Sequence, residues 1–117
     1  MSTATFTDDL VHALERFDTS NIEELFTEDV ELVSIDQTTP PSAPGRLSGR
    51  DTLTAFVDDM RARGLTSKVE RLLRDGDTIV VRTTCTYPDG KLIAGIALLD
   101  LRDGKVARYE EVQAWDA

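Results

Sequence analysis

The sequence predicts an α+β fold, in which helices of the N-terminal half pack on one side of a curved, antiparallel or mixed sheet of about five strands. Apolar residues at helical spacing occur mainly before Gly64, whereas strand-length runs of alternating character dominate after it. The later runs are separated by "RDGD", "YPDG" and "RDGK", which are typical turns of β-hairpins. Helices are therefore expected first and a meander of strands last.

Two helices are expected at the start of the chain. Apolar residues at helical spacing predict a helix over residues 7–17, and "SNIEELF" predicts a second, short one. Ser20 and Glu23 have the spacing of a capping box, which would begin the second helix. His12 falls roughly opposite the apolar stripe of the first helix, so we expect it to be exposed.

A strand, a long loop and a third helix follow. "DVELVSI" alternates and predicts the first strand, and the proline-rich "DQTTPPSAPGRLSG" predicts a loop, either a binding loop or a simple surface excursion. "SGRDTLTAFVDDMRARG" predicts a helix that starts with a capping-box spacing of Ser48 and Asp51 and stops at Gly64. Phe56 and Met60 lie on its apolar face, which packs in the core or lines a cavity.

Four strands complete the expected fold. Their segments are "SKVERLLRDGD", "TIVVRTTCTYPDG", "KLIAGIALLDLRDG" and "KVARYEEVQAW". Gly95 is expected to mark a bend or bulge in the third of these, and Ala94 and Ala97 keep that wall thin. A sheet that curls strongly around a long helix leaves a space at its open end.

Length and charge restrict the class of protein. A chain of 117 residues is expected to form one domain, residues 1–117. Its net charge of -9 argues against binding to nucleic acid or to an anionic membrane surface. No apolar run is long enough to span a bilayer, and the polar, acidic N-terminus does not resemble a signal peptide. We therefore expect a cytoplasmic protein.

The residue types also restrict the chemistry. With His12 as the single histidine, neither a Ser-His-Asp triad nor a zinc site of clustered histidines and cysteines can form, so no metal or other cofactor is expected. A carboxylate-only magnesium or calcium site stays open, although no calcium-loop spacing occurs. Cys85, the single cysteine, is expected to be a half-buried small apolar residue.

The last strand carries an unusual mixture on one face. Alternation places Tyr109, Glu111, Gln113 and Trp115 together. Aromatic and acidic side chains on one face are typical neither of a plain core nor of a plain solvent-facing surface.

The order of elements and three segments resemble the SnoaL-like branch of the nuclear transport factor 2-like superfamily. The segments are "SNIEELFTEDVEL", "LSGRDTLTAFVDDM" and "DGKVARYEEVQAWD". The resemblance implies a cone-shaped, cystatin-like α+β barrel with one deep apolar pocket, and frequent dimerisation through the sheet. Members include steroid isomerases, polyketide cyclases, epoxide hydrolases, dehydratases and many proteins without a known activity.

Steroid isomerases of this superfamily use an aspartate base on the first strand, a tyrosine on the first helix and a buried protonated acid on a later strand. The resemblance places Ser34, Ala13 and either Ala97 or Leu99 at these positions, so all three groups are missing. Asp36, two residues beyond Ser34 on the same face, is a replacement base if an apolar cavity raises its pKa. Its alternative role is to cap the following loop and meet water.

The resemblance also points the mixed face of the last strand into the pocket. Tyr109 and Trp115 would wall a ligand, while Glu111 and Gln113 would orient it. Glu111 is then a second candidate base, or else it pairs with a basic side chain such as Arg82. The resemblance turns Arg82 inward, whereas the apolar alternation of its own strand turns it outward.

The leading hypothesis is a pocket for a hydrophobic small molecule, in an isomerase or cyclase that acts by metal-free proton transfer on a carbonyl compound. Asp36 or Glu111 would be the base, Tyr109 would donate a hydrogen bond to the developing oxyanion, and the protein would form a homodimer. The further candidates for the pocket wall are Ser34, Phe56, Met60, Arg82, Gln113 and Trp115. Two alternatives stay open: a non-catalytic ligand carrier or sensor, and a dimerisation or scaffold module whose cavity its own side chains fill.

Overall fold

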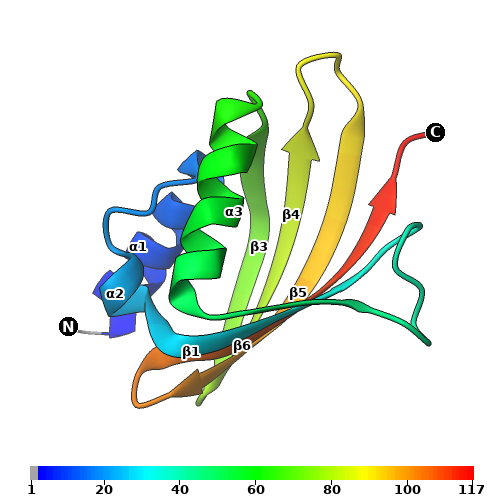
Figure 1. The fold of residues 1–117 in the computed structure, drawn as a ribbon. Helices are drawn as coiled ribbons and strands as arrows, with labels where there is room; N and C mark the ends of the chain where they lie inside the picture. Colours follow the sequence, from blue (N-terminus) through cyan, green and yellow to red (C-terminus); the bar gives the residue numbers. More distant parts are fainter. Residues whose placement is uncertain (1–2) are drawn as a thin grey trace.

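The computed structural model describes residues 3–117 and consists of a strongly curved mixed sheet with helices on its concave side (Figure 1). The elements in chain order are α1 (Thr3–Arg16), α2 (Ile22–Leu25), β1 (Phe26–Ile35), β2 (Gly45–Ser48), α3 (Arg50–Ala62), β3 (Thr66–Asp75), β4 (Thr78–Thr86), β5 (Leu92–Arg102) and β6 (Lys105–Trp115). The predicted α+β class, with helices in the N-terminal half, is confirmed. Among the described residues, no helix combines the length and the apolar character that crossing a lipid bilayer requires.

The sheet pairs its first strand in the sequence, β1, with its last, β6. Its strand order is β2-β1-β6-β5-β4-β3, in which β1 and β6 are parallel and all other neighbours are antiparallel. The parallel pair places Ser34 of β1 beside Glu111 of β6. Residues far apart in the sequence are therefore held next to each other by backbone hydrogen bonds.

The sheet has six strands rather than the expected five, because β2 forms inside the segment predicted to be a loop. Its residues pair with the free edge of β1, and Arg46 adds an ion pair to Glu31 at 2.9 Å. A strand of four residues is too short for alternation to reveal it, and pairing with an available edge overrides its proline-rich surroundings. β1 also begins earlier than expected, at Phe26.

The predicted capping boxes at the starts of the second and third helices are wrong. The N-caps are Asn21 and Gly49, and neither makes a side-chain capping hydrogen bond. Gly49 has φ of 95° and its N–H donates to the carbonyl of Val30 at 2.8 Å, so the turn out of β2 fixes where α3 begins. The helix ends at Ala62, close to the predicted stop at Gly64, which has φ of 80°.

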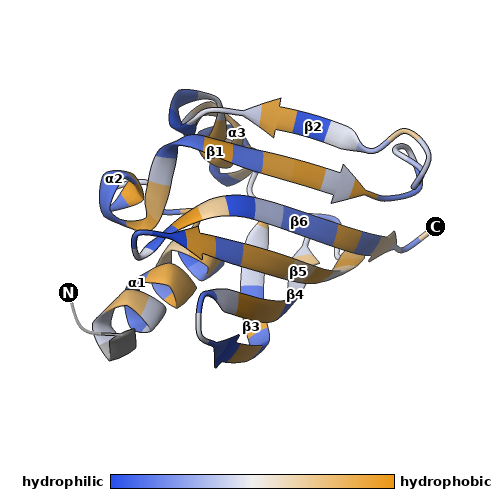
Figure 2. Ribbon diagram, turned by 90° about the horizontal axis from the view of Figure 1, so that it is seen from below, coloured by the Kyte–Doolittle hydropathy of each residue, from blue (hydrophilic) through white to orange (hydrophobic). Residues whose placement is uncertain are grey.

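The hydrophobic core fills one part of the space between the helices and the sheet. Phe6 and Leu10 of α1 pack there against the inner faces of the strands, where alternating residues are fully buried. Hydrophobic and hydrophilic residues alternate along β1 and β6 (Figure 2). The fully buried large side chains are Leu10, Leu25, Val30, Ile79, Val81, Leu99 and Val106.

Of the bend or bulge predicted at Gly95, the bulge is wrong. Gly95 pairs in regular register with Thr83 of β4 and with Gln113 of β6. The irregularity between β5 and β6 lies instead between Asp100 and Leu101, near the turn that joins them. A bulge therefore does not explain the glycine at this position, where Glu111 and Thr83 lie close to its backbone.

Candidate functional site

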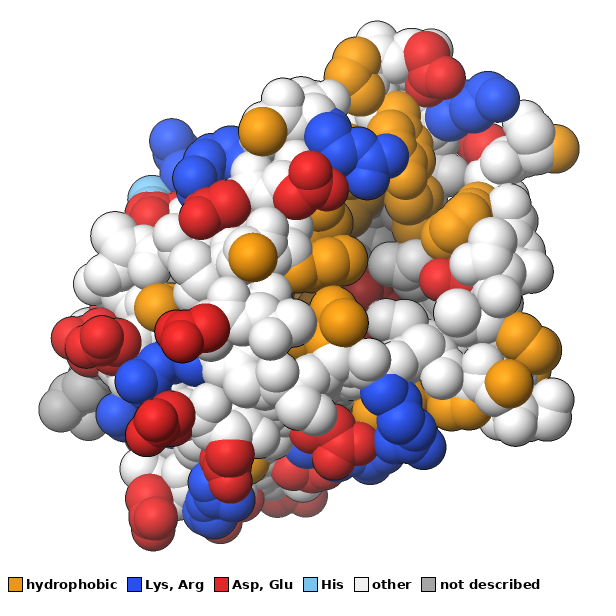
Figure 3. All heavy atoms as spheres, in the orientation of Figure 1, with side chains coloured by type: hydrophobic (Ala, Val, Ile, Leu, Met, Phe, Trp, Pro, Cys, Tyr) orange, Lys and Arg blue, Asp and Glu red, His pale blue; other side chains and the backbone are white. Residues whose placement is uncertain are grey.

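A cavity of about 340 Å³ lies between α3, the C-terminal part of α1 and the inner face of the sheet. The space-filling view shows it as a hollow with largely hydrophobic walls (Figure 3). Its volume falls in the range of about 300–1,000 Å³ found for small-molecule sites. The cavity is not filled by the side chains of the described residues.

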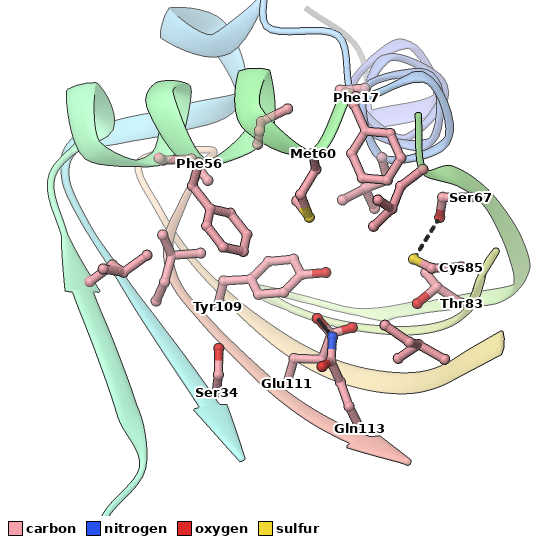
Figure 4. Close-up of a pocket in the computed structure, with 18 of the residues that line it drawn as sticks. Phe17, Ser34, Phe56, Met60, Ser67, Thr83, Cys85, Tyr109, Glu111 and Gln113 are labelled. Atoms are coloured by element: carbon pink, nitrogen blue, oxygen red, sulfur yellow. Dashed lines mark hydrogen bonds between the residues drawn. The ribbon is translucent and has the colours of Figure 1, made fainter. Parts of the chain in front are cut away.

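The helices supply the apolar wall. Phe17 follows α1, and Phe56 and Met60 project from α3 toward the sheet, as the helical spacing predicted (Figure 4). Phe56 is 45% exposed, which places it where the cavity meets solvent. This wall offers a ligand a mainly apolar contact area, and its charged members are Asp18 and Arg63, which follow α1 and α3.

The strands supply most of the polar groups, which project from the opposite wall (Figure 4). Ser34 comes from β1, and the predicted face of β6 does line the cavity with its aromatic, acidic and amide side chains. The polar or aromatic residues of the sheet wall are Ser34, Ser67, Thr83, Cys85, Tyr109, Glu111, Gln113 and Trp115. An apolar wall thus faces a wall with several hydrogen-bonding groups.

Glu111 is the acid in this wall, and its neighbours on β6 orient it. The amide nitrogen of Gln113 donates to Glu111 Oε1 at 3.2 Å, and Trp115 Nε1 donates to the Gln113 amide oxygen at 2.9 Å. An indole N–H can only donate, so it fixes which end of the Gln113 amide faces Glu111. Glu111 forms no ion pair within residues 3–117.

The environment of Glu111 changes its acidity. Burial raises the pKa of this carboxyl to about 7, and the hydrogen bond from Gln113 lowers it only in part. A pKa near neutrality lets one carboxyl both accept and return a proton.

Tyr109 and Cys85 remain protonated beside this acid. Burial first, and then the negative charges that Glu111 and Cys85 carry when ionised, raise the pKa of the Tyr109 hydroxyl well above its ordinary value. Burial likewise raises the pKa of Cys85, whose thiol donates to Ser67 Oγ at 3.6 Å. Cys85 is partly buried, as predicted, and a neutral thiol is a poor nucleophile.

Asp36 lies at the rim of the cavity, but the expected rise of its pKa is wrong. Burial raises the pKa, and hydrogen bonds from Thr38 and Thr39 outweigh that effect and lower it. Its Oδ1 accepts from Thr38 N at 2.7 Å, Thr38 Oγ1 at 2.8 Å and Thr39 N at 2.9 Å. The carboxylate therefore caps the turn after β1, which was its alternative role.

The prediction that Arg82 lines the pocket is also wrong. Its guanidinium donates to the carbonyl of Thr83 and to Thr84 Oγ1, and it does not border the cavity. Ile79, Val81 and Thr83 are the buried residues of β4, so alternation turns Arg82 to the outer face. The apolar pattern of the strand was the correct guide.

Several cavity residues were not singled out from the sequence. Thr83 shares a face with Val81 and Cys85, so the alternation of its strand could have identified it. Ser67 reaches Cys85 only because β3 pairs with β4, and no local pattern shows this register. No group of three or more metal-ligating side chains occurs in residues 3–117.

Solved structures with the same fold include several proteins without a known function. An NTF2-like protein of unknown function from Mesorhizobium loti is 19% identical, with a TM-score of 0.81 over 96% of this chain and 90% of that one. A protein named as a candidate ketosteroid isomerase from Kribbella flavida is 23% identical, with a TM-score of 0.76 over 97% and 76% of the two chains. At these identities the likeness concerns the fold.

A further solved structure, an uncharacterised protein with a cystatin-like fold from Silicibacter pomeroyi, is 18% identical, with a TM-score of 0.76 over 96% and 75% of the two chains. No curated protein sequence matches this chain. The profile of the SnoaL-like domain family, in contrast, matches residues 7–109. The match covers the helices from residue 7 onward and all of the sheet except the end of β6, so the chain belongs to the SnoaL-like family.

Proposed function

We propose that this protein binds a hydrophobic carbonyl compound in its cavity and transfers a proton within it, as a metal-free isomerase or cyclase. The observation that carries the proposal is the Glu111 carboxyl, which lies in a largely apolar cavity and has a pKa raised to about 7. Asp36, the other candidate base, has a lowered pKa and three hydrogen bonds within its own turn. Glu111 is therefore the base.

The proposed step begins with Glu111 ionised. Its carboxylate takes a proton from the carbon next to the ligand carbonyl, and the electron pair of the C–H bond moves to form an enolate. In an isomerase, the protonated Glu111 returns that proton to another carbon of the conjugated system. In a cyclase, the enolate carbon attacks a second carbonyl of the same molecule, and the new alkoxide takes the proton.

Tyr109 is placed to stabilise the negative charge that develops on the ligand oxygen. Its hydroxyl faces the cavity and makes no hydrogen bond with another described residue (Figure 4). Its raised pKa keeps the hydroxyl protonated at neutral pH, so it can donate. The apolar wall of Phe17, Phe56 and Met60 would hold the hydrocarbon part of the ligand.

A second candidate function is a non-catalytic carrier or sensor with the same cavity. It is favoured by Ala13, Ser34 and either Ala97 or Leu99, which leave the positions of the three steroid isomerase groups without an acid or a phenol. Such a protein would bind hydrophobic ligands and leave their protons in place.

Proton exchange separates the two functions. The probe is 2-tetralone, a flat hydrophobic ketone, and proton NMR in heavy water follows the loss of its α-proton signal. We expect the protein to accelerate exchange above the buffer rate, and Glu111→Gln to lower the acceleration by about 100-fold or more, because the amide cannot accept the proton. Asp36→Asn is the matched control and should stay within about twofold.

Binding is measured in parallel through the fluorescence of Trp115. If Glu111→Gln binds 2-tetralone and exchanges its protons as fast as the unchanged protein, Glu111 is not the base. If the unchanged protein binds the ketone but never exceeds the buffer rate, the carrier function is the better account.

We also propose a homodimer formed through the outer face of the sheet. Large apolar side chains are exposed there, among them Ile96 at 52%, Val112 at 51% and Leu98 at 46%. Ile96 pairs with Val112 in the register of β5 and β6, so they form one patch. Sedimentation velocity should show a dimer that Ile96→Glu converts to a folded monomer, and a monomer before substitution would disprove it.

A further inference from the structure

Gly95 occupies a position where the backbone does not require glycine. It lies within β5, it is not among the glycines with positive φ, and its pairing on both sides is regular. Glycine inside a strand lowers stability relative to alanine because it adds entropy to the unfolded chain. The fold of the strand therefore gives no reason for a glycine here.

The side chain of Glu111 gives that reason. A Cβ atom built on Gly95 would lie 2.3 Å from Glu111 Oε2 and 3.2 Å from Glu111 Cδ. It would also lie 3.1 Å from Thr83 Oγ1. The space that the missing side chain leaves open is thus the space in which the Glu111 carboxyl lies.

The two oxygens of this carboxyl have different surroundings. Oε1 accepts the hydrogen bond from Gln113, whereas Oε2 lies over Gly95 and makes no hydrogen bond with another described residue. When Glu111 is neutral, Oε2 is therefore the oxygen that carries the proton.

We infer that Gly95 is a positioning residue, which lets the Glu111 carboxyl lie down on the sheet with Oε2 available for proton transfer and the cavity above it open. Its consequence for catalysis rests on the function proposed above, whereas the positioning itself can be tested in the free protein. An alanine would push the carboxyl off the sheet and into the space meant for a ligand.

The direct test measures the pKa of Glu111 in Gly95→Ala. Protein labelled with ¹³C in its glutamate carboxyl groups is titrated by NMR, and Glu111→Gln assigns the signal. We expect the pKa to fall from about 7 by about one unit or more, because the displaced carboxyl moves from its desolvated position toward the open cavity. An unchanged pKa would overturn the inference, whatever happens to activity.

A second pair of variants separates the contact from a general effect of alanine on the strand. In Glu111→Ala the space over Gly95 is free of the carboxyl, so adding Gly95→Ala should not lower the melting temperature and should leave 2-tetralone binding unchanged. If Gly95→Ala alone does not fold and the double variant does, the clash with Glu111 is confirmed. If both fail to fold, glycine is needed for another reason and the inference is wrong.

These outcomes are distinct from those that test the proposed function. A shifted Glu111 pKa in Gly95→Ala, together with no proton exchange by the unchanged protein, keeps the positioning role and removes the catalytic one. If proton exchange depends on Glu111 but is equally fast in Gly95→Ala, and the pKa of Glu111 is unshifted there, the catalytic role of Glu111 stands and the positioning role of Gly95 is wrong.

Discussion

The turn after β1 and the centre of β6 each place one carboxyl at the same cavity, yet the pKa values of the two acids are shifted in opposite directions. Asp36 has a lowered pKa, and Glu111 has a pKa raised to about 7. The difference lies in burial and in donors: Glu111 is deeply buried and accepts one hydrogen bond, from the neutral amide of Gln113, whereas Asp36 is barely buried and accepts three from its turn. Lying beside a cavity does not by itself raise the pKa of an acid; burial raises it where hydrogen-bond donors do not offset that effect.

The comparison also separates two uses of a carboxylate. In the turn, the charge holds the backbone of Thr38 and Thr39, so protonation would weaken the structure. On β6 the charge is the less favourable form in the folded state, so the structure tolerates a proton there. Only the second acid is suited to passing a proton to a ligand.

The largest expected effect is the pH dependence of stability in Glu111→Gln. The folded protein holds the Glu111 proton more tightly than the unfolded chain, so the free energy of unfolding decreases as pH rises from about 4.5 to about 7. Above this window, Glu111→Gln should be more stable than the unchanged protein, by up to about 3 kcal/mol, and below it the two should be alike. Urea unfolding at several pH values measures the difference.

Asp36→Asn is the control for this prediction, because its sign is reversed. The stability that a lowered pKa contributes is present above the ordinary pKa of 3.8 and is lost as pH falls below it. Asp36→Asn should therefore be less stable at pH 7, by about 1 kcal/mol, and the deficit should disappear in acid. If both variants were destabilised at pH 8, the contrast between the two acids would be wrong.

The sequence predicted which helices and strands form better than it predicted the residues at which they begin and end. The helical spacing near Phe56 and the alternation of β6 reflect long, regular patterns, and both were confirmed. β2 has four residues and owes its strand conformation to the edge of β1, which no local pattern encodes. The helix starts were misplaced because the turn at Gly49, and not a side-chain cap, sets the beginning of α3.

The site was predicted in part for the same reason. Alternation was sufficient to bring Tyr109, Glu111 and Gln113 to one wall, since a single strand carries them. The role of Asp36 depended on donors in the loop that follows it. The role of Gly95 depended on the side chain of Glu111, which lies two residues before Gln113, the partner of Gly95 across the sheet. Such contacts follow from register and side-chain reach, which one sequence does not specify.

The smallest expected effect tests the donor argument at Glu111 itself. Gln113→Leu removes the one hydrogen bond that lowers the pKa of this carboxyl, so the pKa should rise above its value of about 7. The rise should be smaller than the fall expected in Gly95→Ala, because burial and not Gln113 is the larger cause. The same ¹³C titration measures it.

Trp115→Phe is the matched control for Gln113→Leu. It keeps Gln113 and removes the N–H that fixes the orientation of its amide, so the pKa of Glu111 should rise by less than in Gln113→Leu. A pKa that fell in either variant would mean that water replaces the lost donor with a better one. The number of donors within the protein would then have no part in the difference between Glu111 and Asp36, and burial alone would have to explain it.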